Sequence, residues 1–212
     1  SKIILMTTAI LICLPAIFFF TNDFKMFSGE ERTLLSFFQS ITTRTAGFNT
    51  ADMALMTESG KAVMIFLMLI GGSPSSTAGG MKTTTFAVLI LNAFATFRRE
   101  DAGAFGRRFD GQVIKNAATI AMLYFMLLFF GGITISVYEG LPVLTCFYEA
   151  ASAVGTVGLT LGVTPGLHII SRLILIALMY LGRVGGMTLI YAVFSGKNNN
   201  GARMPLEKIT VG

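Results

Sequence analysis

The sequence has little of the chemistry that enzymes use. It contains one histidine and two cysteines, and charged residues make up 13% of its 212 residues, whereas a soluble domain usually carries about 25%. Cys13 and Cys146 have the spacing of neither a metal site nor a disulfide framework. The apolar segments also lack a pair of carboxylates. This scarcity argues against a membrane enzyme, because it leaves no nucleophile–base or metal constellation.

Long apolar segments make up most of the chain instead. Hydrophobic residues account for 53% of it, and roughly 18 or more apolar residues in a row suffice to cross a bilayer as a helix. We expect four membrane spans, at residues 3–20, 62–97, 117–138 and 169–194. In this setting the formal net charge of +5 indicates orientation in a lipid bilayer, and no nucleic-acid partner is expected.

The basic residues gather on one side of these spans. Lys2, the loop 98–115 and the tail 197–212 share that side, while the opposite side carries a balanced or acidic set. Cytoplasmic segments are the ones enriched in Lys and Arg. The sequence therefore predicts a multi-pass protein of the cell (plasma) membrane with both termini cytoplasmic.

The second expected span is unusually long and is interrupted. As an unbroken helix, residues 62–97 would extend about 54 Å, against a hydrocarbon core of about 30 Å. Residues 73–85 are rich in Gly, Ser and Thr and include one Pro. Broken helices at membrane depth occur where they line a cavity or are buried in protein. We therefore expect this break to face a pathway, although a linker outside the membrane is the alternative.

Two Thr-x-Gly segments follow stretches that are too short to cross a membrane. Thr45–Gly47 comes after residues 33–41, and Thr156–Gly158 comes after residues 142–154. Glycine allows a positive φ, and such turns can direct backbone carbonyls toward one axis, as in the filters of cation channels. The alternative is two ordinary loop glycines in a chain that contains 23.

An internal repeat favours the filter interpretation. The order span, short helix, Thr-x-Gly and span occurs twice. Three pairs of segments match in order: Phe37-Phe38-Gln39 with Phe147-Tyr148-Glu149, Thr45-x-Gly47 with Thr156-x-Gly158, and Gly79-Gly80-Met81 with Gly185-Gly186-Met187. The predicted fold is an all-α integral membrane protein with two diverged span–pore helix–filter–span repeats, 1–97 and 116–196, a cytoplasmic loop 98–115 and a cytoplasmic tail 197–212.

These segments resemble a known family. Residues 42–50 and 152–160 are similar to the third and fourth filters of the Trk/Ktr/HKT superfamily of potassium transporters, and the likeness is closest to the membrane subunit of bacterial Ktr systems (KtrB). Members have four fused units around one ion path, and two filter turns cannot enclose an ion on four sides. Either another chain supplies the other turns, or this chain is the C-terminal half of a longer protein, which the resemblance favours.

The resemblance implies a set of functional residues. Potassium would bind backbone carbonyls of the filter, with no organic cofactor, at Thr45, Ala46, Gly47, Thr156, Val157 and Gly158. An intramembrane gate would comprise Gly72, Ser73, Pro74, Ser75, Ser76, Thr77, Gly79, Gly80, Lys82 and Arg183. The implied partners are the N-terminal half of the pore, a second copy in a homodimer, and a cytosolic nucleotide-binding regulatory ring of the KtrA type, which would dock on the basic loop and tail.

Some alternatives stay open at this point. Arg183 would project into the pore or form a buried ion pair, and Arg44 would brace the filter from behind or point outward. A secondary transporter coupled to Na⁺ or H⁺, with an unwound binding helix, is the alternative function. It fits the two short helices less well, and the four expected spans contain no Asp or Glu to carry a proton.

Overall fold

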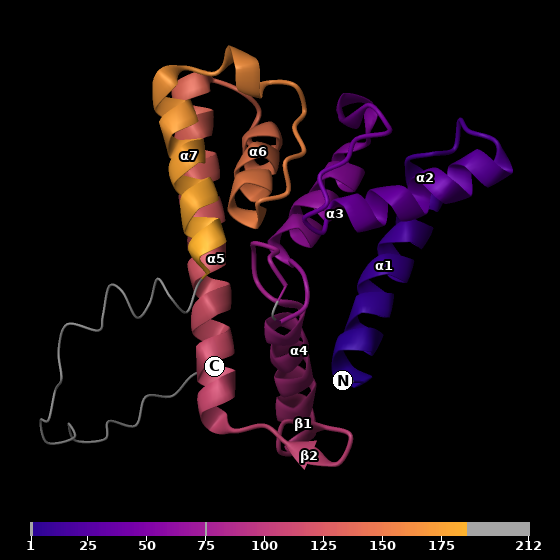
Figure 1. Cartoon of the computed structure of the whole chain (residues 1–212), viewed down its shortest axis with the longest axis vertical. Coiled ribbons are helices and arrows are strands. Elements are labelled where there is room, and N and C mark those ends of the chain that lie inside the picture. The colour runs from indigo at the N-terminus through magenta and orange to yellow at the C-terminus, as the bar shows by residue number, and fades with distance from the viewer. Residues whose placement is uncertain (1, 75, 186–212) are drawn as a thin grey trace, which may run out of the picture.

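The fold is a bundle of helices, seen in Figure 1, and the computed structural model describes residues 2–74 and 76–185. The α-helices in this part of the chain are α1 (Lys2–Asn22), α2 (Gly29–Thr42), α3 (Glu58–Leu69), α4 (Thr83–Arg98), α5 (Gly111–Glu139), α6 (Val143–Gly155) and α7 (Ile169–Val184). Short 3₁₀ helices, η1 (Met53–Leu55) and η2 (Thr164–Gly166), follow the two Thr-x-Gly segments. The predicted all-α composition holds apart from one small hairpin of β1 (Gly103–Ala104) and β2 (Arg107–Arg108).

Two of the helices are long and apolar enough to cross a bilayer on their own. They are α1, with 21 residues, and α5, with 29 residues. Large apolar side chains of α5, such as Phe130 and Val137, are exposed on this chain. Water would disfavour such a surface, so it suits lipid or another protein surface.

The expected interruption of the second span is present. Helix α3 ends at Leu69 and α4 begins at Thr83. The non-helical segment, residues 70–82, starts and ends a few residues earlier than the predicted 73–85. Thr83, Thr84 and Thr85 belong to the first turn of α4, and the buried Thr83 donates its hydroxyl to the Gly71 carbonyl at 3.2 Å. Thr83, Thr84 and Thr85 therefore start helix α4 and do not belong to the break.

Other boundaries differ from the prediction. Helix α7 ends at Val184, because Gly185 has φ 85° and ψ 137°, which no α-helix accommodates. Residues 186–194 of the expected span 169–194 lie outside the described residues. Helix α5 begins at Gly111, inside the expected loop, because the Asp110 carboxylate accepts from the Gln112 N–H at 3.3 Å and caps it. Helix α2 begins at Gly29 because the acidic Glu30 and Glu31 suit a helix N-terminus.

The two halves of the described chain share one order of elements. A long helix (α1 or α5) leads to a short helix (α2 or α6), then to a Thr-x-Gly turn, a 3₁₀ helix and a further helix. Helix α2 packs on α1, and α6 packs on α5, α3 and α7 (Figure 1). The expected matches at Gly186 and Met187 lie outside the described residues.

Helix α6 is largely buried, between α3, α5 and α7. Every residue from Tyr148 to Gly155 is buried. Small side chains let its neighbours approach closely: the Cα of Gly155 lies against the Met68 carbonyl of α3, and the Cα of Gly182 in α7 lies against the Val154 carbonyl. A methyl group at either glycine would overlap that carbonyl. The turn that follows α6 is therefore held by packing on several sides.

Candidate cation pathway

The two Thr-x-Gly turns have matching backbones. Thr45 and Gly47 have φ of 65° and 75°, and Thr156 and Gly158 have φ of 52° and 92°. A β-branched residue at positive φ is a genuine outlier, costing roughly 1–2 kcal/mol. The same exception occurs at the same place in both repeats. Each turn must therefore be held in this shape by its surroundings.

The end of each short helix supplies hydrogen bonds that hold its turn. The Gly47 N–H donates to the Thr42 carbonyl at 3.1 Å, and the Thr42 hydroxyl donates to the Phe48 carbonyl at 2.5 Å. In the second repeat the Val157 N–H donates to the Ser152 carbonyl at 2.9 Å, and the Gly158 N–H donates to the Ser152 hydroxyl at 3.2 Å. In each repeat a hydroxyl near the end of the short helix therefore bonds the backbone at the end of the turn: Gly158 in the second, and Phe48, directly after the turn, in the first.

The fold brings the two turns together. The Cα of Gly47 lies against the carbonyl of Val157, so closely that a Cβ at Gly47 would overlap the carbonyl oxygen. Beside them a cavity of about 560 Å³ is lined by Thr156, Val157 and Gly158, together with Arg183 from the last turn of α7. The two turns thus touch at Gly47 and Val157, and the expected gate residue Arg183 lines the cavity beside the second turn.

The segment between α3 and α4 is a closed loop. Ile70 and Met81 form a parallel bridge, in which the Gly71 N–H donates to the Met81 carbonyl at 2.8 Å and the Met81 N–H donates to the Leu69 carbonyl at 2.9 Å. Inside the loop the Lys82 ammonium donates to the carbonyls of Ser76 and Ala78 at 3.1 and 2.7 Å. Lys82 therefore uses carbonyls of the loop itself as partners.

This loop, residues 70–82, carries every expected gate residue except Arg183. Of these, Ser75 lies outside the described residues. The Cα of Gly79 packs directly against the side chain of Thr156 in the second Thr-x-Gly turn. A further cavity, of about 430 Å³, lies between the loop and the end of α7, with Lys82 and Arg183 in its lining. The expected gate residues therefore adjoin the expected filter residues.

The direction of Arg44, which the sequence left open, is defined. Its guanidinium donates to the Gly71 carbonyl at 3.2 Å and to the Thr83 hydroxyl at 3.0 Å. Arg44 thus points toward the segment between α3 and α4 and ties the first turn to both ends of it. Arg183, by contrast, has no ion-pair partner among the residues that the structure describes.

One buried charged residue beside the second turn was not singled out from the sequence. Glu149 of α6 entered only as part of a repeat match, yet its buried carboxylate accepts hydrogen bonds from the segment that follows Gly158. The signal that could have found it is an acidic residue inside a short apolar helix, since such a residue requires partners.

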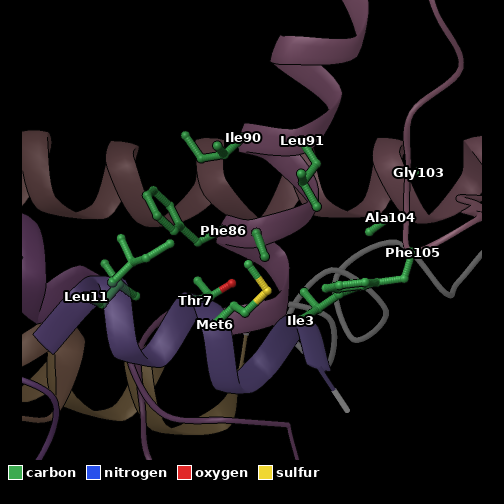
Figure 2. Close-up of a pocket in the computed structure, with 12 residues that line it drawn as sticks. Ile3, Met6, Thr7, Leu11, Phe86, Ile90, Leu91, Gly103, Ala104 and Phe105 are labelled. Carbon is green, nitrogen blue, oxygen red and sulfur yellow. The ribbon is translucent and has the colours of Figure 1, made fainter. Parts of the chain in front are cut away.

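A separate cavity lies away from these turns. Figure 2 shows it between α1, α4 and the β-hairpin, with Met6, Leu11, Ile90 and Phe105 among its lining residues. Its volume is about 370 Å³, and Thr7 supplies the one polar side chain of the lining residues. Because a bare cation needs several oxygen ligands, this apolar cavity is not part of the candidate pathway.

Two helices of spanning length, α1 and α5, with shorter helices packed on them, are compatible with a helical membrane protein. More particularly, the chain belongs to the TrkH family: the model for this family, described as a cation transport protein, matches residues 2–200. This match confirms the resemblance drawn from the sequence.

Curated relatives agree with the family. The chain is 38% identical over 224 residues to the potassium/sodium uptake protein NtpJ of Enterococcus hirae, covering 100% of this chain and 50% of that protein. It is 34% identical over 183 residues to the Ktr system potassium uptake protein B of Bacillus subtilis, covering 86% of this chain and 41% of that protein. The chain thus spans about half the length of these relatives.

A solved structure shares the fold. The crystal structure of the potassium transporter TrkH from Vibrio parahaemolyticus superposes with a TM-score of 0.73 and covers 91% of this chain and 43% of that chain. The sequence identity is 20%, so the likeness shows the fold alone.

Proposed function

We propose that this chain forms half of a pore for potassium uptake across the cell membrane. The observation that carries the proposal is the pairing of two Thr-x-Gly turns with matching positive-φ backbones, Gly47 of one against Val157 of the other. The names of the relatives support the substrate, since they are potassium or potassium/sodium uptake proteins.

In this proposal the two turns are two quarters of a selectivity filter. Carbonyls of Thr45, Ala46 and Gly47, and of Thr156, Val157 and Gly158, would replace part of the water shell of K⁺. Positive φ at both Thr and Gly is compatible with carbonyls that share one direction. The other two quarters would come from an N-terminal half of the same protein, which the doubled length of the relatives supports.

The loop 70–82 would act as the gate. It packs against Thr156 through Gly79, and its shape is held by Lys82. Arg183 lines the cavities on both sides of this contact. A fixed positive charge there would raise the barrier for cations, so loop and arginine together would limit passage.

The proposed setting follows from charge and from the relatives' names. The basic side, with Lys2 and the loop 98–115, would be cytoplasmic, with both termini there. Names that refer to a Ktr system suggest several components. We assign a homodimer and a nucleotide-binding ring of the KtrA type as partners, the ring docking on the loop 98–115 and on the tail 197–212, which lies outside the described residues.

Transport is favoured over catalysis because the curated relatives are uptake proteins. Passive flow is favoured over coupling to Na⁺ or H⁺ because the two paired turns suit a filter, whereas an unwound binding helix alone would suit a coupled transporter.

The decisive experiment measures rubidium uptake by potassium-starved, uptake-deficient cells that produce the complete protein containing this chain. Gly47→Asp and Gly158→Asp should abolish uptake and K⁺/Na⁺ selectivity. The matched control is Gly29→Asp, at the exposed start of α2, where no neighbour lies within 4 Å of an added Cβ. Uptake and selectivity that survive both filter substitutions would refute the proposal.

A further inference from the structure

Glu149 connects the short helix α6 to the chain beyond the second Thr-x-Gly turn. Its carboxylate is buried, with 4% of the residue exposed. One oxygen, Oε1, accepts from the Thr160 hydroxyl at 2.7 Å and from the Leu161 N–H at 2.8 Å. The other, Oε2, accepts from the Thr164 hydroxyl at 2.7 Å. One side chain thus fixes three positions of the segment 160–164.

The network extends one step further. The Thr160 and Thr164 hydroxyls also lie 3.0 Å from each other. The Thr160 oxygen accepts from the Gly162 N–H at 3.0 Å. Because a backbone N–H can only donate, the Leu161 N–H makes Oε1 of Glu149 an acceptor. Hydrogen bonds to an ionised group are about twice as strong as neutral ones.

The negative charge has no basic partner. No ion pair joins Glu149 to a Lys or Arg among the residues that the structure describes. Its side chain lines the same 560 Å³ cavity as Thr156, Gly158 and Arg183. A charge that is screened by protein rather than water acts over several ångströms. The field of Glu149 therefore reaches the turn and opposes that of Arg183.

The first repeat lacks this arrangement. The matching position is Gln39, which is neutral and equally buried. Its amide nitrogen contacts the sulfur atoms of Met53 and Met64 at 3.1 and 3.2 Å. Those contacts reach η1 and α3 and leave the residues directly after Gly47 unbraced by this side chain. A structural need common to both repeats would not explain the carboxylate, because the first turn forms without one.

We propose that Glu149 is a positioning and specificity-determining residue of the pore. It holds the segment after Gly158 at a fixed distance from α6, and its charge favours a cation at the adjacent carbonyls. Selectivity in such filters depends on the number and field of the coordinating groups. This inference rests on the proposed function, since a filter must exist for Glu149 to tune it.

The test measures Rb⁺/Na⁺ uptake ratios and the half-saturating K⁺ concentration of the complete protein. Glu149→Gln removes the charge and keeps the size of the side chain. We expect the selectivity ratio to fall roughly tenfold, the order expected for the loss of one charge-assisted hydrogen bond. Glu149→Asp, which keeps the charge, should recover part of the ratio. The matched control Glu58→Gln removes an exposed carboxylate from the start of α3 and should change nothing.

A second variant separates this role from folding. Thr160→Val combined with Thr164→Val removes two donors, leaves Glu149 in place, and should also lower the ratio. If Glu149→Gln fails to reach the membrane, this double variant tests whether the hydrogen bonds of Glu149 set the selectivity ratio. Wild-type selectivity and K⁺ affinity in either correctly inserted variant would overturn the inference. Failure of the proposed function is distinct, because Gly158→Asp would then leave uptake intact whatever Glu149 does.

Discussion

Gly79 of the loop between α3 and α4 lies directly against the side chain of Thr156 in the second Thr-x-Gly turn. The two residues come from different repeats, and glycine is required because any Cβ at position 79 would overlap the threonine. Thr156 itself has a strained backbone, with φ of 52°. The proposed gate and the proposed filter thus share one contact surface, so a change in either must move the other.

Substituting Gly79 tests this contact. Gly79→Ala should push the loop away from Thr156 and raise basal Rb⁺ flux severalfold, because the added methyl has no room. The measurement is flux in cells producing the complete protein without the proposed regulatory ring. Gly166→Ala is the control, since its added methyl meets nothing within 4 Å. Unchanged flux in a correctly inserted Gly79→Ala variant would show that the contact does not restrict passage.

Removing the Lys82 ammonium should have a similar effect. Lys82→Met keeps most of the side-chain volume but leaves the carbonyls of Ser76 and Ala78 without their donor. Losing such charge-assisted hydrogen bonds costs on the order of 1.5–3 kcal/mol. The loop should therefore open more often, and basal flux should rise about tenfold or more. Deleting residues 73–77 should raise it as well. Lys25→Met, at an exposed position outside the loop, is the control.

The charge of Arg183 should limit cation flow. Arg183→Gln removes a positive charge from the lining of both cavities and should increase K⁺ conductance in single-channel or flux recordings. Arg183→Lys retains the charge and should stay near the wild-type rate. Equal rates for the Gln and Lys variants would mean that size, rather than charge, sets the barrier.

A stability prediction concerns the close packing of α6 on α7. Gly182→Ala places a methyl on the Val154 carbonyl, and such overpacking costs typically about 1–3 kcal/mol. The melting temperature of the detergent-solubilised protein should fall by several degrees, measured by intrinsic fluorescence or a thiol-reactive dye. Gly166→Ala should melt like the wild type. A Gly182→Ala protein with unchanged melting would indicate that the two helices can separate freely.

The features that depend on local sequence were predictable. Apolar runs indicated α1 and α5, and small residues with Pro74 indicated the break before α4. The Thr-x-Gly pattern indicated both turns, because a requirement for positive φ leaves a glycine in the sequence.

Features that depend on tertiary contacts were not predictable. Arg44 could have pointed either way, and only its bonds to Gly71 and Thr83 define the direction. The partners of Glu149 follow it by more than ten positions, so no local pattern connects them. The end of α7 at Val184 depends on the positive φ of Gly185, and a glycine in the sequence does not by itself show where a helix ends.

The bridge between Ile70 and Met81 has a consequence for how this protein can diversify. Since the two ends of the loop are hydrogen-bonded to each other, α3 and α4 remain joined whatever lies between them. Insertions, deletions or substitutions at residues 73–78 can therefore occur while the flanking helices keep their positions. A change of loop length is tolerated because the entropy cost of closing a loop grows only slowly with its length. If the loop acts as the proposed gate, its threshold for opening can therefore change in evolution while the flanking helices keep their positions.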